Sequence, residues 1–248
     1  MKILLFITLF TFSAFNAWGC TKTLTVATNE SYWPPYVILK NNTLGGTEID
    51  VLKAIFKSSP YCLNFSVLPS SLRAFEELEQ GRVDLIFAAS KTAERAEYAE
   101  YAHFTLPYRV EKMLLYKHAS SPNVNSINAL FKKSLTVGVN RGSVFGDAFE
   151  HLRTQYANQV VLTEESKKRF TLLNKQRINF LIDDSLVAQY FTKQYSNIMP
   201  APLVEPINVN NVHFMLSKKT VTADDIAAIN SYITNNKAVI ERIYQSHQ

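Results

Sequence analysis

One pattern constrains the fold of this 248-residue chain more than any other: the order strand, helix, strand, helix, strand occurs twice. Short apolar runs that alternate with segments of helical periodicity indicate parallel strands joined by crossover helices. The expected elements are 23–28, 48–56, 64–69, 71–81 and 83–89, then 135–140, 145–156, 159–163, 167–176, 178–183 and 185–195. The sequence therefore predicts an α/β protein with two lobes, each a mostly parallel sheet flanked by helices.

The expected helix ends agree with this pattern. Gly81 follows the second segment of helical periodicity, at the position where a residue in the left-handed conformation commonly ends a helix. Thr222 and Asp225 have the spacing of a capping box and predict the start of a C-terminal helix. Its apolar stripe extends from Ile226 to Ile243, so we expect this helix to pack against a lobe.

The first 19 residues have the composition of a secretory signal peptide. Lys2 precedes an apolar run at 3–15, and the small residues Ala17 and Gly19 lie around the expected cleavage point. This run is short for a membrane span, and no later segment reaches ~18 consecutive apolar residues. We therefore expect residues 1–19 to be removed, the mature chain to start near Cys20, and the protein to reside in the periplasm.

Charge and motif content exclude several classes of protein. The formal net charge is +5 and scattered, and the longest basic cluster, 167–169, is expected on an exposed helix face. The five histidines lack the spacing of metal ligands, and there is no nucleophile elbow, Walker loop or dinucleotide fingerprint. We expect no nucleic-acid partner, no metal, no cofactor, and a binding function rather than an enzyme.

Polar and aromatic residues follow four of the expected strands, where open α/β sheets bind their ligands. These segments are NESYWPPY at 29–36, SKTAER at 90–95, NRGSVFG at 140–146 and DDS at 183–185. Together these segments could bind a small zwitterion. A protein cation would bind its carboxylate, a protein carboxylate would bind its ammonium, and aromatic rings would contact the rest of the ligand. Arg95 fits this interpretation, because a cation in the first turn of a helix opposes the helix dipole unless an anion binds there.

Five ordered motifs of the mature chain resemble those of the family 3 periplasmic solute-binding proteins, the amino-acid-type receptors of ABC importers. The motifs are TLTVATNESYWPPYV, GGTEIDVLKAIF, LEQGRVDLIFAASKTAERAEYAEYAHFTLPY, LTVGVNRGS and QRINFLIDD. The resemblance implies a two-lobe periplasmic binding protein-like fold of type II. It also implies a monomer without a cofactor that captures a small carboxylate-bearing solute, an amino acid or a relative, and delivers it to an ABC permease in the inner membrane.

The resemblance further implies how the chain divides between the lobes. Lobe one is expected to comprise residues 20–108 and 214–248, and lobe two residues 112–206. Segments 109–111 and 207–213 are expected to cross between them as hinges. A ligand that contacts both lobes would bind the closed state better and shift the population toward it.

Motif positions assign ligand-binding roles by the same resemblance. Arg95, in the T-x-x-R motif, is expected to bind the α-carboxylate of the ligand with its two-pronged guanidinium, near the hydroxyls of Ser90 and Thr92. Asp184 is expected to bind the α-ammonium. The remaining predicted contacts are the rings of Tyr32 and Trp33, the backbone N–H groups of Gly142 and Ser143 at a helix start, and Asn29.

The chain departs from the family pattern at two positions. Asn29, with Glu30 beside it, stands where amino-acid binders often have an acidic residue, and Val144 stands at the position of a frequent threonine. These differences leave open a different small carboxylate, an aromatic ligand or a short peptide.

Structural explanations compete with these assignments. Arg95 could be a solvated helix arginine, Trp33 and Tyr36 could be packing aromatics, and one of Asp183 and Asp184 could cap the helix that follows. At the level of function, the alternatives are a periplasmic enzyme on the same fold, similar to cyclohexadienyl dehydratase, and a ligand-sensing module.

Cys20 and Cys62 precede the first two expected strands. Because neighbouring parallel strands begin side by side, we expect the two sulfurs to form a disulfide in the oxidising periplasm. The alternative is a lipoprotein acylated at Cys20, and Trp18 disfavours it because small residues are usual at that cleavage site.

Overall fold

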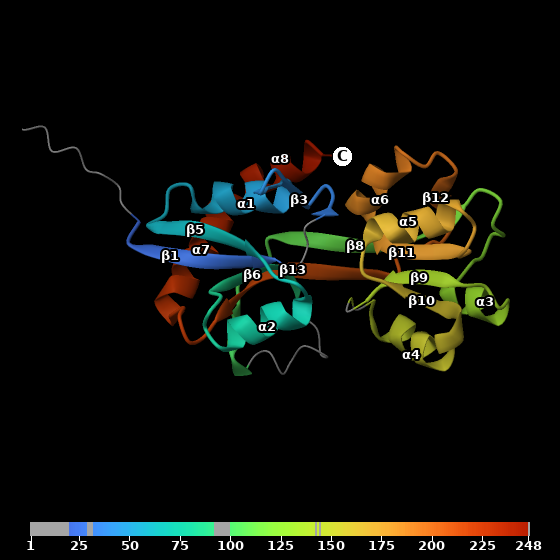
Figure 1. Ribbon diagram of the computed structural model, residues 1–248, viewed down its shortest axis with the longest axis horizontal. Coiled ribbons are helices and arrows are strands. Elements are labelled where there is room, and N and C mark those ends of the chain that lie inside the picture. Colours follow the sequence, from blue (N-terminus) through green and yellow to red (C-terminus); the bar gives the residue numbers. More distant parts are fainter. Residues whose placement is uncertain (1–19, 29–31, 92–99, 142, 144, 248) are drawn as a thin grey trace, which may run out of the picture.

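Two long antiparallel strands connect the two halves of the computed structural model, which describes residues 20–28, 32–91, 100–141, 143 and 145–247 (Figure 1). They are β8 (Arg109–His118) and β13 (Asn208–Ser217). The two strands pair from Asn208 opposite Met113 to Val212 opposite Arg109. The predicted hinges, 109–111 and 207–213, thus lie in or beside paired strands. The exact lobe boundaries stay a prediction.

Lobe one contains the parallel strands β1 (Lys22–Thr28), β5 (Tyr61–Val67) and β6 (Leu85–Ser90), with the short strand β7 (Ala102–Phe104) beside β13. Its helices are α1 (Thr47–Phe56), α2 (Ser71–Glu79), α7 (Ala223–Asn235) and α8 (Lys237–Gln245). Helices α1 and α8 cover one face of the sheet and α2 covers the other (Figure 1). The adjacent residues Val26 and Ala27 of β1, which point to opposite faces, are both fully buried, as expected for a strand covered on both faces.

Lobe two repeats this arrangement with the parallel strands β9 (Val137–Asn140), β10 (Val160–Thr163) and β11 (Phe180–Asp184). Its helices are α3 (Ile127–Lys132), α4 (Asp147–Gln155), α5 (Ser166–Asn174) and α6 (Ser185–Thr192); a 3-10 turn (Ala157–Gln159) and β12 (Ile198–Pro200) complete it. The sheet order β10-β9-β11-β8-β13-β6-β1-β5 is continuous through both lobes. The predicted two-lobe α/β architecture is confirmed.

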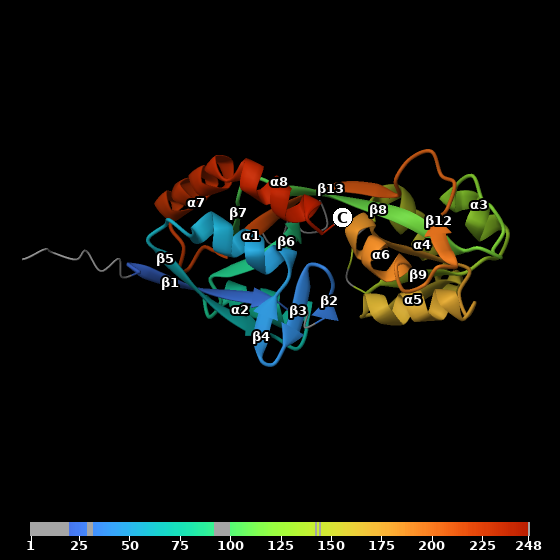
Figure 2. The ribbon, with the colours of Figure 1, turned by 90° about the horizontal axis from the view of Figure 1, so that it is seen from above.

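A second, three-stranded sheet consists of β2 (Tyr32–Trp33), β3 (Val37–Lys40) and β4 (Thr43–Gly45). The sequence analysis did not predict it. It packs beside α1, on the side of lobe one that faces lobe two (Figure 2). Gly46 connects β4 to α1 with φ of 107°, and a Cβ there would lie 2.5 Å from the backbone oxygen of Tyr36, so only glycine fits.

The expected elements are present, and their ends differ from the predicted ones by three residues at most. Gly81 adopts φ of 73° after α2, and Thr222 and Asp225 form the predicted capping box of α7. The apolar stripe from Ile226 to Ile243 is not one helix, because the backbone leaves helical geometry at Asn236 and restarts as α8. Among the described residues, no helix has the length and apolar character of a membrane span.

The two cysteines form the predicted disulfide. Cys20 and Cys62 are bonded, with their Cα atoms 5.5 Å apart. Thr23 of β1 pairs with Cys62 of β5, so the parallel register places both cysteines at the same edge of the sheet. The bond therefore joins the beginnings of two neighbouring strands, far from the hinge.

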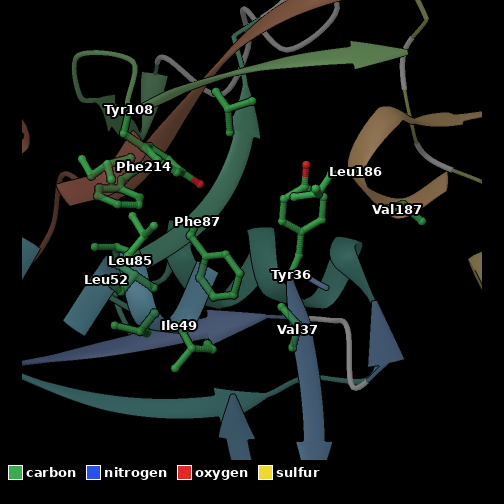
Figure 3. Close-up of a cluster of buried hydrophobic side chains, with 14 of the residues drawn as sticks. Tyr36, Val37, Ile49, Leu52, Leu85, Phe87, Tyr108, Leu186, Val187 and Phe214 are labelled. Carbon is green, nitrogen blue, oxygen red and sulfur yellow. The ribbon is translucent and has the colours of Figure 1, made fainter. Parts of the chain in front are cut away.

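The largest buried cluster extends across both lobes. It includes Tyr36, between β2 and β3, and Val37 of β3, together with Leu186 and Val187 from α6 (Figure 3). The lobes are therefore in apolar contact on this side of the hinge, and burial of these side chains stabilises that contact.

Candidate functional site

A cleft of about 740 Å³ lies between the lobes, at the carboxyl ends of their parallel strands. Thr28 and Ser90 line it from lobe one, Asn140 and Asp184 line it from lobe two, and Glu111 of β8 lines it from the hinge. Crevices at the carboxyl ends of α/β strands are the usual ligand sites of such folds. A second depression, of about 610 Å³, adjoins Cys20 and Cys62 but is lined by lobe one alone. We therefore place the candidate site in the cleft between the lobes.

The structure brings five predicted site residues to this cleft: Tyr32, Trp33, Ser90, Ser143 and Asp184. The other four, Asn29, Thr92, Arg95 and Gly142, lie outside the described residues. Their roles, including the carboxylate contact of Arg95, stay predictions.

Asp184 has the capping role that the sequence left open for Asp183 or Asp184. It is the N-cap of α6, and its Oδ1 accepts hydrogen bonds from the backbone N–H groups of Leu186 at 2.8 Å and Val187 at 3.3 Å. The same oxygen accepts a bond from the Tyr36 hydroxyl at 2.7 Å. No other described residue donates to Oδ2. Capping therefore holds the carboxylate in place, with Oδ1 occupied and Oδ2 without a donor among the described residues.

The neighbouring Asp183 forms a buried salt bridge with Arg169. The Arg169 guanidinium donates to Asp183 Oδ2 at 2.7 and 3.3 Å, and also to Thr163 Oγ1 at 3.0 Å and Asn140 Oδ1 at 3.2 Å. Burial raises the pKa of Asp183, and Arg169 opposes that shift. Arg169 thus ties the ends of β9, β10 and β11 together. The expectation that cluster 167–169 is exposed is wrong for Arg169, which is 2% exposed because α5 turns it toward the sheet.

Buried charges at the hinge were not predicted. The Arg109 Nε donates to Glu48 Oε1 at 2.7 Å, and the Tyr108 hydroxyl donates to Glu48 Oε2 at 2.6 Å. The guanidinium also lies 4.5 Å from the centre of the Tyr36 ring, a cation–π distance. Glu111, two residues along β8, is buried at the base of the cleft. Burial raises the pKa of Glu111 to about 7, although Arg109 opposes the shift.

The two predicted aromatic contacts differ in their surroundings. The Tyr32 side chain is at the surface, and its hydroxyl lies 3.3 Å from that of Tyr190 on α6, across the cleft. Trp33 is partly buried against the large core, with its ring 4.4 Å from that of Tyr36. Both line the cleft, so each offers a ring to a ligand while Trp33 also packs.

The backbone of β6 is irregular where it reaches the cleft. Ala88 has φ of 56°, and its N–H donates to the Tyr108 hydroxyl at 3.0 Å. The pairing of β6 with β13 shifts register between His213 and Met215 at the same level. A local bulge of this kind redirects the following residues, here toward the cleft at Ser90. In the part of the chain that the structure describes, no group of three His, Cys, Asp or Glu side chains could hold a metal ion.

Comparisons with known proteins agree with this geometry. A sequence comparison with curated proteins gives no significant match. Among solved structures, an ancestral arginine-binding protein bound to arginine has a TM-score of 0.75 and 21% identity, covering 90% of this chain and 97% of that one. A histidine kinase sensor domain similar to periplasmic binding proteins has a TM-score of 0.74 and 19% identity, covering 90% and 95%.

A third structure is an ancestral amino acid-binding protein described as a precursor of cyclohexadienyl dehydratase. It has a TM-score of 0.71 and 19% identity, and the alignment covers 90% of this chain and 94% of that one. At these identities the likeness shows the fold. The sequence profile of the bacterial extracellular solute-binding proteins, family 3, matches residues 24–246, nearly the whole described chain. The chain belongs to family 3 of the bacterial extracellular solute-binding proteins.

Proposed function

We propose that this solute-binding protein captures a small carboxylate-bearing solute, an amino acid or a close relative, between its lobes in the periplasm and delivers it to an ABC permease. The observation that carries the proposal is the cleft between the lobes, with a fixed carboxylate, Asp184, that keeps one oxygen free of described partners. The family supports a solute as ligand, and the arginine bound to one structural neighbour supports an amino acid.

The proposed pose uses both lobes. Arg95 binds the α-carboxylate, Asp184 Oδ2 accepts from the α-ammonium, and Tyr32 and Trp33 contact the body of the ligand. A ligand held in this way adds contacts to both lobes in the closed state only, and so favours closure. The closed form is the state that a permease would recognise.

A thermal-shift screen tests the proposal with the purified mature protein. The panel consists of the standard amino acids, short peptides and small organic acids. A ligand at about 100 times its dissociation constant adds roughly 2.7 kcal/mol of stability, a clearly measurable rise in melting temperature. No shift with any of these compounds would contradict the proposal. Mass spectrometry of the same protein incubated with prephenate-like acids tests the enzyme alternative, since turnover would release a product of lower mass.

A further inference from the structure

Glu111 differs from every other carboxylate described around the cleft base. It is 7% exposed, it lines the cleft, and no hydrogen bond joins its carboxylate to any other described residue. Its nearest cationic atom is Arg109 Nη1, 3.9 Å from Oε1, beyond hydrogen-bond length. A buried ionised carboxylate without a hydrogen-bonding partner is costly, so a group supplied from the cleft would satisfy it.

No surrounding described residue donates a hydrogen bond to Glu111. Arg109, on the same strand, attracts it from 3.9 Å, but its Nε is bonded to Glu48 of α1 and its Nη1 and Nη2 have no hydrogen-bond partner among the described residues. From β11, Asp183 is bonded to Arg169, and Asp184 accepts three hydrogen bonds on one oxygen. The electrostatic influence of Asp184, Glu48 and Asp183 on Glu111 is repulsive.

Among the described buried side chains near the base of the cleft, carboxylates outnumber guanidinium groups. Four buried carboxylates, those of Glu48, Glu111, Asp183 and Asp184, face two guanidinium groups, those of Arg109 and Arg169. Each guanidinium has its closest pairing with one carboxylate, Glu48 or Asp183. Among the described residues, Glu111 and Asp184 are therefore the two carboxylates of this group that no cation hydrogen-bonds, and Arg109 approaches Glu111 only to 3.9 Å.

The sheet places these two carboxylates close together but at separate positions. Asp184 pairs with Met113 across β11 and β8, and Glu111 lies two residues before Met113 on the same buried face of β8. Diagonal neighbours of this kind have Cα atoms on the order of 7–8 Å apart. Two cationic groups of one ligand can thus each reach a carboxylate.

We propose that Glu111 is the counter-ion of a second cationic group of the solute, so that the ligand class is the basic amino acids, with an ammonium or guanidinium side chain. This inference rests on the proposed function and narrows it. In it, Asp184 binds the α-ammonium and Glu111 binds the side-chain cation.

The protonation of Glu111 makes the inference sensitive to pH. Because burial raises the pKa of Glu111 to about 7, much of the ligand-free protein carries a neutral carboxyl at pH 6. A cationic ligand binds the ionised form, so its affinity rises with pH as Glu111 deprotonates. The affinity for a basic amino acid should increase about tenfold between pH 6 and pH 8.

Calorimetry of the mature protein with L-arginine, L-lysine and L-citrulline tests the inference. Citrulline has nearly the shape of arginine but an uncharged side chain. We expect wild type to bind arginine or lysine at least ~10-fold more tightly than citrulline. Glu111→Gln should lose at least ~10-fold of that affinity, change citrulline binding less than about threefold, and bind independently of pH from 6 to 8.

Glu164→Gln is the matched control, because Glu164 also lines the cleft but its side chain is 79% exposed and lies beside Arg141. This variant should bind like wild type. Equal wild-type affinity for arginine and citrulline would overturn the inference, as would an equal loss for both in Glu111→Gln. Binding of neutral amino acids alone would overturn it and leave the proposed function intact, whereas no amino acid binding at all would overturn both. If Glu111→Gln does not fold, two wild-type measurements test the inference instead. They are the preference for arginine or lysine over citrulline and the increase of that affinity from pH 6 to pH 8.

Discussion

The hydroxyl of Tyr36 donates a hydrogen bond of 2.7 Å to Oδ1 of Asp184, and this bond joins lobe one to the N-cap residue of α6 in lobe two. Tyr36 is 3% exposed and Asp184 is 2% exposed, so the bond is shielded from water. The Asp184 carboxylate, which we propose to bind the α-ammonium of the ligand, is therefore also part of a contact between the lobes. Opening of the cleft on this side would have to break the bond.

Tyr36→Phe should weaken the contact between the lobes. The substitution removes one hydrogen bond to a charged group and keeps the ring, so we expect a loss of about 1–3 kcal/mol in unfolding free energy. Urea unfolding measures that loss, and small-angle scattering of the ligand-free variant should show a larger radius. Tyr190→Phe is the control, because among the described residues its hydroxyl meets only the exposed Tyr32 hydroxyl, so the change should alter stability by less than ~0.5 kcal/mol. Equal effects of both substitutions would contradict a special role for the Tyr36 bond.

Arg95→Ala should lower ligand affinity without affecting the fold. If Arg95 binds the ligand carboxylate in a closed cleft, its removal should cost about 2–5 kcal/mol of binding, at least ~30-fold in affinity. Arg95→Lys should also bind poorly, because an ammonium lacks the planar two-point grip of a guanidinium. Calorimetry with the ligand found in the screen measures both variants. If Arg95 instead faces solvent, Arg95→Ala and Arg95→Lys should both bind the ligand with wild-type affinity.

Asp225 should contribute stability that depends on pH. Burial alone would raise its pKa, but hydrogen bonds from Lys22, Tyr61 and Thr222 outweigh burial and lower the pKa below its usual range. A carboxyl whose folded pKa is lowered stabilises the fold above its unfolded pKa, about 3.9, and this contribution is lost as the pH falls through the folded value.

We therefore expect Asp225→Asn to lose about 1–3 kcal/mol at pH 7. The difference between wild type and variant should shrink as the pH is lowered from about 4.5 toward 2.5. Chemical unfolding at several pH values gives this difference directly. Asp224→Asn, at the neighbouring exposed position of the same helix turn, should behave like wild type throughout. A difference that stays constant with pH would exclude the charged form of Asp225 as its source.

Removal of the disulfide should lower stability without altering the cleft. The Cys20–Cys62 bond closes a loop with a sequence separation of 42, which contributes up to ~4 kcal/mol in the chain-entropy account. The double variant Cys20→Ser, Cys62→Ser should unfold at lower urea and be insensitive to reductant, while reductant should shift wild type to the same midpoint. Intact mass of the protein from its native host checks the pairing, because a diacylglycerol on Cys20 with a free Cys62 thiol would contradict it.

Local sequence signals were sufficient to predict most of the fold. The period-2 and period-3.6 patterns, Gly81 and the box of Thr222 and Asp225 act within a few residues, so they are readable without the tertiary structure. The hairpin sheet at 32–45 was missed because its strands are short, and Asn41 and Asn42 make its turn with positive φ in place of glycine. The length of β8 and β13 was missed because their stability depends on each other across about a hundred residues of chain.

The sequence predicted which residues line the cleft where a motif specifies one position. It did not predict the charged residues that are buried at the base of the cleft. The place of Asp184 at the cleft could be predicted from its position at the end of a strand, whereas its contact with a ligand, which the family resemblance implies, stays a prediction. The places of Arg169 and Glu111 could not be predicted, because charged residues in a basic cluster or a strand normally face water. Only the tertiary contacts with Asp183, and the position of β8 below the cleft, show that both point inward.

The strand order has a consequence for how the protein is made. Strand β13 lies between β8 and β6, yet it is synthesised after all of lobe two. Lobe two and β8 can complete their pairing while β6 still presents an unpaired edge, and α1 still lacks α8 against its apolar face. Until β13 and α8 are in place, the open edge of β6 and the apolar face of α1 are surfaces that favour aggregation of an incomplete chain, so truncation before β13 should yield insoluble protein.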